Sequence, residues 1–282
     1  MNRDIQRAKA EAFRAMHDRS RILVLPNAWD AMSARVIEEA GARAIATTSA
    51  GVAFSVGYPD GEAIPRAEMI SAIARIARVV TLPITADIES GFALDAREVA
   101  ETVRRVIDAG AVGINLEDQV HDGTPHLYDL DEAVDRVRAA REAADSVGVP
   151  IVINARTDVY LLGIGEPDAR FEHAIRRANA YRKAGADCLF LPAVTRRADI
   201  EQIVPALEGP LNLLAFPSLP TIPELERLGV ARLSVGTWLT LNAMSALRKT
   251  TAELLSTGTY ESMLAGDITF ADANRLMASH GS

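Results

Sequence analysis

Short apolar runs alternate along the chain with longer segments in which apolar residues recur at helical spacing. The runs hold three to five residues, which is typical of strands buried on both faces and too short for helices. Two runs follow a proline, Pro83 or Pro150, where the missing N–H is not yet needed by a sheet. The pattern predicts eight strands, at residues 22–25, 44–47, 84–87, 113–117, 151–155, 188–191, 211–215 and 233–235.

The segments between these strands predict helices, and one phrase recurs where a helix gives way to a strand. Ala40-Gly41-Ala42, Ala109-Gly110-Ala111 and Ala184-Gly185-Ala186 each place a glycine where a left-handed helix end is favoured. Strands that alternate with helices pair in parallel, and eight such units favour a closed (β/α)8 TIM barrel. An open, doubly wound sheet is the alternative, but neither GxGxxG nor GxxxxGKS/T occurs. The helices are expected at residues 31–40, 66–79, 96–109, 131–146, 168–184 and 197–204.

The chain continues beyond the eighth strand for longer than a barrel needs. Leu241, Met244 and Leu247 recur there at helical spacing, so this face has to be buried against its own barrel or a neighbour's. We therefore expect one barrel domain over residues 1–282, with residues 239–282 as a C-terminal helical extension. We also expect self-association into a homo-oligomer, either a dimer or a tetramer.

Composition narrows the range of partners. The chain has 30 basic and 38 acidic residues, a net charge of −8, and only 5% aromatic residues. Such a protein is a poor general binder of nucleic acid or of an anionic membrane surface. The single cysteine, Cys188, excludes disulfides and cysteine-rich zinc sites. The charged N-terminus has no apolar core of a signal peptide, and no apolar run approaches a membrane span, so we expect a cytoplasmic protein.

Carboxylates follow two neighbouring predicted strands. Asp87 and Glu89 come at the end of the third strand, and Glu117 ends the fourth. Carboxylates that converge at a barrel mouth repel one another unless a cation or a proton joins them. Oxygen ligands without cysteine suit a hard ion, so these three residues predict a Mg²⁺ or Mn²⁺ site. Acidic residues also cap helices, and for a single one of them, such as Asp60, capping is the better interpretation.

Arg156 follows the buried run of the fifth strand. An arginine in that place needs an anionic partner, because an unpaired guanidinium away from water is costly. Its planar fork fits a carboxylate or a phosphonate of a substrate. A structural ion pair with Glu117 or Asp158 is an equal alternative.

Small and polar residues follow other strands. Ser49-Ala50-Gly51 predicts a turn that lets ligand oxygens approach backbone N–H groups. Trp29 is a candidate to line the same pocket, and Asn212 lies on the seventh strand. His121 and His126 stand in a polar loop placed to act as a lid, but two histidines in such a loop are more often surface residues.

These motifs occur in one order along most of the chain. They are Pro26-Asn27-Ala28-Trp29-Asp30, Ser49-Ala50-Gly51, Gly57-Tyr58-Pro59-Asp60, Asp87-Ile88-Glu89-Ser90-Gly91-Phe92, Glu117-Asp118-Gln119-Val120 and Ala155-Arg156-Thr157-Asp158. With them the chain resembles the isocitrate lyase and phosphoenolpyruvate mutase superfamily over residues 25–217. The resemblance implies a (β/α)8 barrel that binds Mg²⁺ with α-oxo acids or their enolates. It also implies that C–C or P–C bonds are made or broken, in dimers or tetramers that exchange C-terminal helices.

The resemblance also implies a metal site. Asp87 matches the acid that touches Mg²⁺ most directly, and Glu89 stands where the family usually has aspartate. Glu117 matches a carboxylate that supports the metal from farther away.

The resemblance also implies which residues contact the substrate. Arg156 matches the arginine that holds the substrate carboxylate or phosphonate. Ser49 and Ala50 match backbone donors to the pyruvyl group. Asp60 matches an aspartate near the reacting end, and its role differs between subfamilies. The catalytic candidates are therefore Asp60, Glu117 and Arg156.

Departures from the family pattern bear on the reaction. The lyases carry a Lys-Lys-Cys-Gly-His loop after the fourth strand, whereas residues 119–126 contain neither cysteine nor lysine. Ala193 and Ala215 replace glutamates of the lyases. We therefore expect a Mg²⁺-dependent lyase or decarboxylase of an α-oxo or 2-hydroxy acid that does not use the usual cysteine. A phosphoenolpyruvate mutase or phosphonopyruvate hydrolase is the alternative, and a non-catalytic metal-dependent binder of α-oxo acids is a third.

Overall fold

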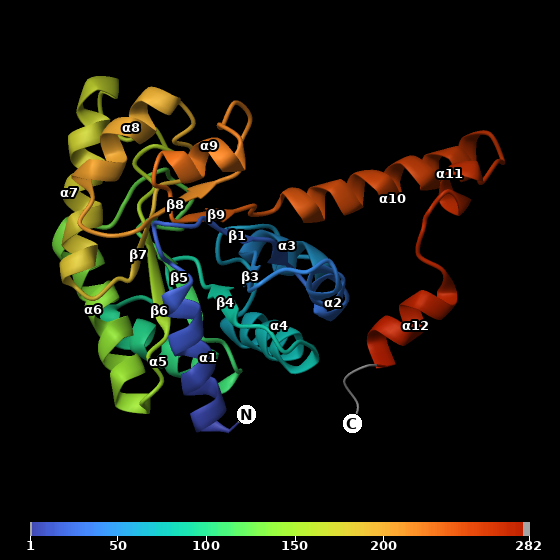
Figure 1. The fold of residues 1–282 in the computed structure, drawn as a ribbon, viewed down its shortest axis with the longest axis horizontal. Coiled ribbons are helices and arrows are strands. Elements are labelled where there is room, and N and C mark those ends of the chain that lie inside the picture. Colours follow the sequence, from blue (N-terminus) through green and yellow to red (C-terminus); the bar gives the residue numbers. More distant parts are fainter. Residues whose placement is uncertain (1, 279–282) are drawn as a thin grey trace.

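Parallel strands alternate with helices in the computed structural model of the chain, which describes residues 2–278 (Figure 1). Every strand pairs in parallel with its neighbours, in the order β1-β9-β8-β7-β6-β5-β4-β3-β2. The predicted (β/α)8 TIM barrel is therefore confirmed. The strands are β1 (Leu23–Leu25), β2 (Asn27–Ala28), β3 (Ile45–Thr47), β4 (Ile84–Asp87), β5 (Gly113–Glu117), β6 (Val152–Arg156), β7 (Cys188–Phe190), β8 (Leu211–Leu214) and β9 (Arg232–Ser234).

The first predicted strand, residues 22–25, corresponds to β1, and a second short segment that was not predicted, β2, follows it and closes the barrel. The segment β1 pairs with the last strand, β9, and β2 pairs with β3 on the other side. Pro26 stands between them and has no N–H to donate, but its carbonyl accepts a hydrogen bond from the Ala46 N–H at 3.0 Å. These two segments thus join both ends of the sheet.

Helices cover the outside of the barrel in two groups. The helices α5 to α8 form one wall, and α2 to α4 form the other (Figure 1). The segments α3 and α9 were not predicted as helices; the expected turn at Ser49 is the first turn of α3, capped by Thr48. The bounds are α1 (Arg3–Ala15), α2 (Ala31–Glu39), α3 (Ser49–Ser55), α4 (Arg66–Val79), α5 (Ala96–Asp108), α6 (Leu130–Val147), the short 3₁₀ turn η1 (Pro167–Ala169), α7 (Arg170–Lys183), α8 (Arg197–Ala206) and α9 (Ile222–Arg227).

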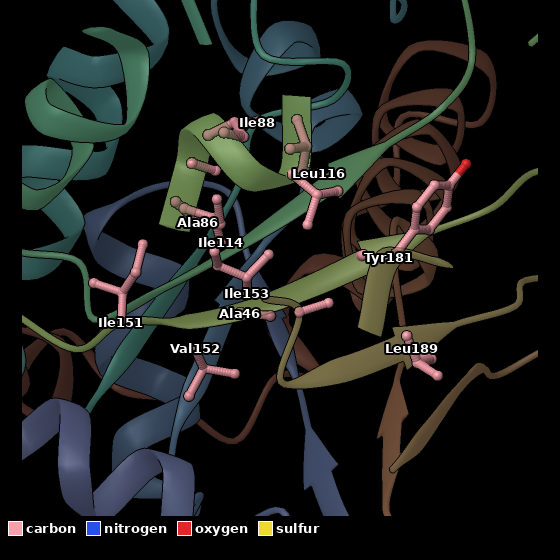
Figure 2. Close-up of a cluster of buried hydrophobic side chains, with 14 of the residues drawn as sticks. Ala46, Ala86, Ile88, Ile114, Leu116, Ile151, Val152, Ile153, Tyr181 and Leu189 are labelled. Atoms are coloured by element: carbon pink, nitrogen blue, oxygen red, sulfur yellow. The ribbon is translucent and has the colours of Figure 1, made fainter. Parts of the chain in front are cut away.

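Aliphatic side chains fill the core between strands and helices. Ile114 and Ile153, on neighbouring strands, are fully buried and lie beside each other in Figure 2. The residues of β4 and β5 are buried on both faces, as expected for a parallel sheet covered by helices. The glycines of the recurring helix-end phrase have the left-handed φ that the phrase predicts, for example 103° at Gly110.

The C-terminal extension leaves the barrel. The helix α10 (Trp238–Ser256) projects outward, and α11 (Glu261–Leu264) and α12 (Phe270–Ala278) follow it (Figure 1). Only Thr240 is buried on α10, while Leu247 is 68% exposed and Leu255 is 80% exposed. The chain's own barrel therefore leaves most of this apolar face uncovered. No helix within residues 2–278 combines the length and the hydropathy that crossing a membrane requires.

Candidate active site

A pocket of about 170 Å³ opens at the carboxyl ends of the strands. This is the end of a TIM barrel where active sites form, because the loops after the strands converge there. Five of the predicted site residues line it: Ser49, Ala50, Asp60, Asp87 and Arg156. The other lining residues are Asn27, Thr48, Asn115, Phe190, Leu214, Ser234, Gly236 and Thr237.

Asp87 ends β4 with one carboxylate oxygen occupied and the other not. Its Oδ2 accepts hydrogen bonds from the Ser49 N–H at 3.1 Å and from the Ser49 hydroxyl at 2.9 Å. Its Oδ1 is buried and has no hydrogen-bond partner within residues 2–278. Burial raises the pKa of this carboxyl, and the nearby Glu117 raises it further. An orphaned carboxylate oxygen in a pocket fits the ligand chemistry of Mg²⁺ or Mn²⁺.

Arg156 ends β6 and is held between two buried carboxylates. Its Nη1 lies 2.7 Å from Glu117 Oε2, and its Nε donates to Asp158 Oδ1 at 2.6 Å. The guanidinium also lies over the face of Phe190, 5.7 Å from the ring centre. The structural ion pairs that the sequence offered as one interpretation of Arg156 are therefore present, and the residue also lines the pocket. Within residues 2–278, no hydrogen bond occupies its Nη2.

Glu117 and Glu89 are not among the residues that line this pocket. Burial raises the pKa of Glu117, but the Arg156 guanidinium together with the hydrogen bond and charge of His121 outweighs that effect and holds the pKa below its usual value. Glu89 accepts a hydrogen bond from the Glu62 N–H at 2.7 Å. Burial, followed by repulsion from Glu117, raises the pKa of Glu89 to about 9. The part of the chain described here holds no ready cluster of three His, Cys, Asp or Glu side chains for a metal.

His121 belongs to this site, although the sequence pattern favoured a surface role. Its side chain is only 11% exposed, and its Nε2 lies 2.9 Å from Glu117 Oε1 and 3.7 Å from Glu89 Oε2. Burial lowers the pKa of His121, but the hydrogen bond and charge of Glu117 raise it to about 9. In the sequence, the sign of this contact was that His121 follows Glu117 by four residues. His126 is exposed, as the sequence suggested.

Asp60 reaches the pocket from the loop between α3 and α4. Partial burial raises the pKa of its carboxyl, although the Gly61 N–H opposes the shift, and Glu117 adds to it. Asp60 is thus more readily protonated than an aspartate in water. A carboxyl of this kind at a pocket mouth is able to take part in proton transfer.

Three other predicted residues lie outside the pocket lining. A side chain on Gly51 would come within 2.6 Å of Thr48 and Thr240, so this glycine permits α10 to approach α3. Trp29 lines a separate apolar pocket of about 260 Å³ with residues of α3 and α10. Asn212 is fully buried and reaches the pocket only through its hydrogen bond to Ser234 at 3.2 Å.

Ser234 and Thr237 line the pocket and were not found from the sequence. Ser234 ends β9 and Thr237 comes shortly after it, and neither is an acidic or basic residue that would draw attention in the sequence. Thr237 lies 3.1 Å from the hydroxyl of Thr48, so the start of α10 closes one side of the pocket. Asn27 also binds the segment that precedes α10, because its Oδ1 accepts hydrogen bonds from the N–H groups of Val235 and Gly236.

Comparisons with known proteins give matches in both sequence and structure. The sequence model of the family described as phosphoenolpyruvate phosphomutase matches residues 13–255. The 2-methylisocitrate lyase of Escherichia coli K12 is 36% identical over 232 residues, which cover 78% of this chain and 76% of that enzyme. The oxaloacetate decarboxylase of Rhodopseudomonas palustris BisB18 is 31% identical over 217 residues, which cover 73% of this chain and 71% of that enzyme.

Solved structures match over nearly the whole chain. A candidate lyase or mutase from Burkholderia cenocepacia J2315 superposes with a TM-score of 0.89 at 39% identity, over 98% of both chains. A phosphonopyruvate hydrolase in complex with oxalate and Mg²⁺ superposes with a TM-score of 0.83 at 27% identity. That match covers 95% of this chain and 94% of the hydrolase.

Proposed function

Because this chain belongs to the phosphoenolpyruvate phosphomutase family, we propose that it is a Mg²⁺- or Mn²⁺-dependent lyase or decarboxylase. The membership that the motifs predicted is confirmed, and so is the enzyme class, since the relatives include a lyase and a decarboxylase. The proposed substrate is a small α-oxo or 2-hydroxy di- or tricarboxylate. The bond that breaks is the C–C bond next to its oxo or hydroxyl group.

One observation supports this proposal most directly. The pocket brings an orphaned oxygen of Asp87 together with Arg156, which keeps one guanidinium nitrogen for a ligand. A cation on one side and a fixed guanidinium on the other suit an acid that carries an oxo group beside a carboxylate. Ser49 donates two hydrogen bonds to the carboxylate of Asp87, so this proposed metal ligand is oriented before a cation binds.

The divalent cation would be held directly by Asp87, with Glu89 and Glu117 supporting it from behind. Mg²⁺ keeps several waters, so one direct carboxylate is sufficient. A bound cation would supply a Lewis acid that stabilises the negative charge developing on the oxo oxygen when the neighbouring bond breaks.

The proposed roles of the chain's own residues follow from their places. Arg156 binds the carboxylate of the substrate through Nη2, while Glu117 and Asp158 keep its fork in one orientation. Ser49 and Ala50, in the first turn of α3, line the same pocket and would contact the substrate there. Asp60, whose pKa is raised, holds or moves a proton at the reacting end.

Phosphonate chemistry is the second candidate, supported by the structural match to phosphonopyruvate hydrolase. Asp60 would then attack or orient at phosphorus, and Arg156 would hold the anion. The lid loop, residues 119–126, lacks lysine and asparagine, which places this candidate after the first.

A turnover screen with Mg²⁺ tests both candidates. Oxaloacetate, 2-methylisocitrate, 2,3-dimethylmalate and phosphonopyruvate are each incubated with the enzyme. Pyruvate, other oxo acids and free phosphate are measured separately. We expect a C–C cleavage product from at least one of the first three acids. Phosphate release from phosphonopyruvate alone would favour the second candidate. Metal-dependent oxalate binding without any turnover would leave only a binding protein and overturn both.

The metal assignment is tested with Asp87→Asn, which keeps acceptors for Ser49 but removes the charge. Titration calorimetry with Mn²⁺ and oxalate measures binding without requiring turnover. We expect affinity to fall about tenfold or more in this variant, the loss of one charge-assisted contact. Asp95→Asn is the control, because Asp95 caps α5 on the outside of the barrel. Equal affinity in the two variants would contradict the assignment.

A further inference from the structure

We propose that Glu62 is a positioning residue that fixes two loops of the active site relative to each other. One loop joins α3 to α4 and carries Asp60, and the other joins β4 to α5 and carries Glu89. The role given to these loops rests on the proposed function. Glu62 acts through them and is not itself among the residues that line the pocket.

Glu62 joins the loops by hydrogen bonds in both directions. Its side-chain Oε1 accepts from the Ser90 hydroxyl at 2.8 Å and from the Phe92 N–H at 2.7 Å. Its own N–H donates to Glu89 Oε2 at 2.7 Å. Three bonds thus connect one residue of the first loop to three residues of the second. We call this set of contacts the Glu62 brace.

The brace joins three residues that have an unusual backbone conformation. Glu62, Glu89 and Phe92 have φ values of 57°, 49° and 51°, in the left-handed region that residues with a side chain avoid. Within residues 2–278, only two other non-glycine residues have positive φ. Such conformations are unfavourable and persist where the surroundings hold them, often at functional sites. The brace provides that support at all three positions.

The brace also determines what the neighbouring carboxylates offer to a ligand. It occupies Glu89 Oε2 and leaves Glu89 Oε1 buried without a partner in the described chain. Asp60 precedes Glu62 by two residues, so the place of its carboxyl depends on where Glu62 is held. A change of about 1 Å in such groups is enough to lower turnover of order a hundredfold.

The opposite side of Glu62 faces a different cavity. That cavity has a volume of about 480 Å³ and is also lined by Phe92, His121 and Glu98. Glu98 provides a matched control, because its Oε2 accepts a hydrogen bond from the Leu94 N–H at 2.9 Å on the same loop. Its contact lies on the α5 side of the loop and involves neither Glu89 nor Asp60.

The test compares Glu62→Ala, Glu62→Gln and Glu98→Ala. Mn²⁺ and oxalate affinity is measured by calorimetry, kcat and KM are measured with the substrate identified in the screen, and melting temperature is recorded. We expect Glu62→Ala to lower Mn²⁺–oxalate affinity about tenfold and kcat of order a hundredfold. Glu62→Gln should restore both to within about threefold of the original, because an amide oxygen also accepts both bonds. Glu98→Ala should leave both unchanged.

Several outcomes would overturn the proposal. Glu62→Ala with unchanged affinity and kcat would do so, as would losses in Glu98→Ala equal to those in Glu62→Ala. Failure of Glu62→Gln to restore function would show that charge, and not the brace, is what matters. If Glu62→Ala does not fold, Ser90→Ala removes one bond of the brace and should give a smaller loss of affinity in the same direction; no loss would refute the brace. The binding readout separates this result from the proposed function, since it does not require turnover.

Discussion

Replacement of Arg156 by lysine separates the structural role of this side chain from the ligand-binding role that we propose for it. The arginine pairs with Glu117 through Nη1 and with Asp158 through Nε, and its side chain is 18% exposed. Lysine keeps the charge, but it has a single ammonium group. This group can pair with only one of the two carboxylates, because they bind different nitrogens of the guanidinium. One nearly buried carboxylate is therefore left without its partner.

The size of the effect follows from the hydrogen bonds that lysine cannot make. One charge-assisted hydrogen bond contributes about 1.5–3 kcal/mol to the free energy of unfolding. For a chain of this size the melting temperature should fall by roughly 3–12 °C. Oxalate should also lose the hydrogen bond to Nη2 that we propose, which is worth about the same, so its affinity should fall roughly ten- to a hundredfold.

Arg141→Lys is the matched control at the other end of the barrel. Arg141 Nη2 donates to Asp187 Oδ2 at 2.5 Å, and both side chains are 16% exposed. Its other nitrogens donate to the carbonyl oxygens of Gly185 and Ile151. This variant should lose comparable stability and bind oxalate as before, because Asp187 precedes β7 at its amino end.

Chemical unfolding and oxalate titration with Mn²⁺ are measured on both variants. We expect similar losses of stability in the two variants but a loss of affinity only in Arg156→Lys. If Arg156→Lys binds oxalate like the original chain and differs from it only in stability, Arg156 is a structural residue. The pocket would then lack its anion anchor, and the proposed substrate class would lose its main support.

Three further predictions concern other parts of the molecule. Burial raises the pKa of Cys188 to about 12, so a thiol reagent at pH 8 should label it only after unfolding, and rapid labelling of the folded protein would contradict this placement. Leu247 and Leu255 are exposed on α10, so light scattering should give a multiple of 30.3 kDa at micromolar concentration, and a monomer mass would refute the predicted self-association. The hydroxyls of Ser262 and Thr259 lower the pKa of Glu253 to about 2. The stability that ionised Glu253 gives to the turn after α10 should therefore be fully present above about pH 4.5 and should be lost as the pH falls through 2. A midpoint near 4.5 in an NMR titration of this carboxyl would disprove the prediction.

The periodic sequence pattern was sufficient to predict the barrel. Runs such as residues 113–117 and 84–87 became strands with those bounds, and the glycine phrase marked the helix ends correctly. These features are local, because a strand buried on both faces and a helix end each have their own residue preferences. Since parallel strands bring their carboxyl ends together, the same pattern placed Asp87 and Arg156 at one pocket.

Contacts between distant segments could not be predicted in this way. Gly51 was expected to approach a ligand, but it makes room for Thr240, which lies almost two hundred positions later. His121 was set aside as a surface residue because nothing local shows that its loop folds back onto Glu117. The pairing of β1 with β9 and of β2 with β3 could not be predicted either, because these partners lie at opposite ends of the sheet.

The sequence by itself therefore determined the barrel, the family and the strand ends at which polar groups gather. Only the tertiary structure decided how those groups divide their contacts. Glu117 and Asp158 pair with different nitrogens of the same guanidinium, and Glu89 accepts a hydrogen bond from the Glu62 N–H. The physical reason is that hydrophobic periodicity depends on each segment alone, whereas hydrogen bonds and ion pairs depend on distances of a few ångströms that exist only after the barrel has closed.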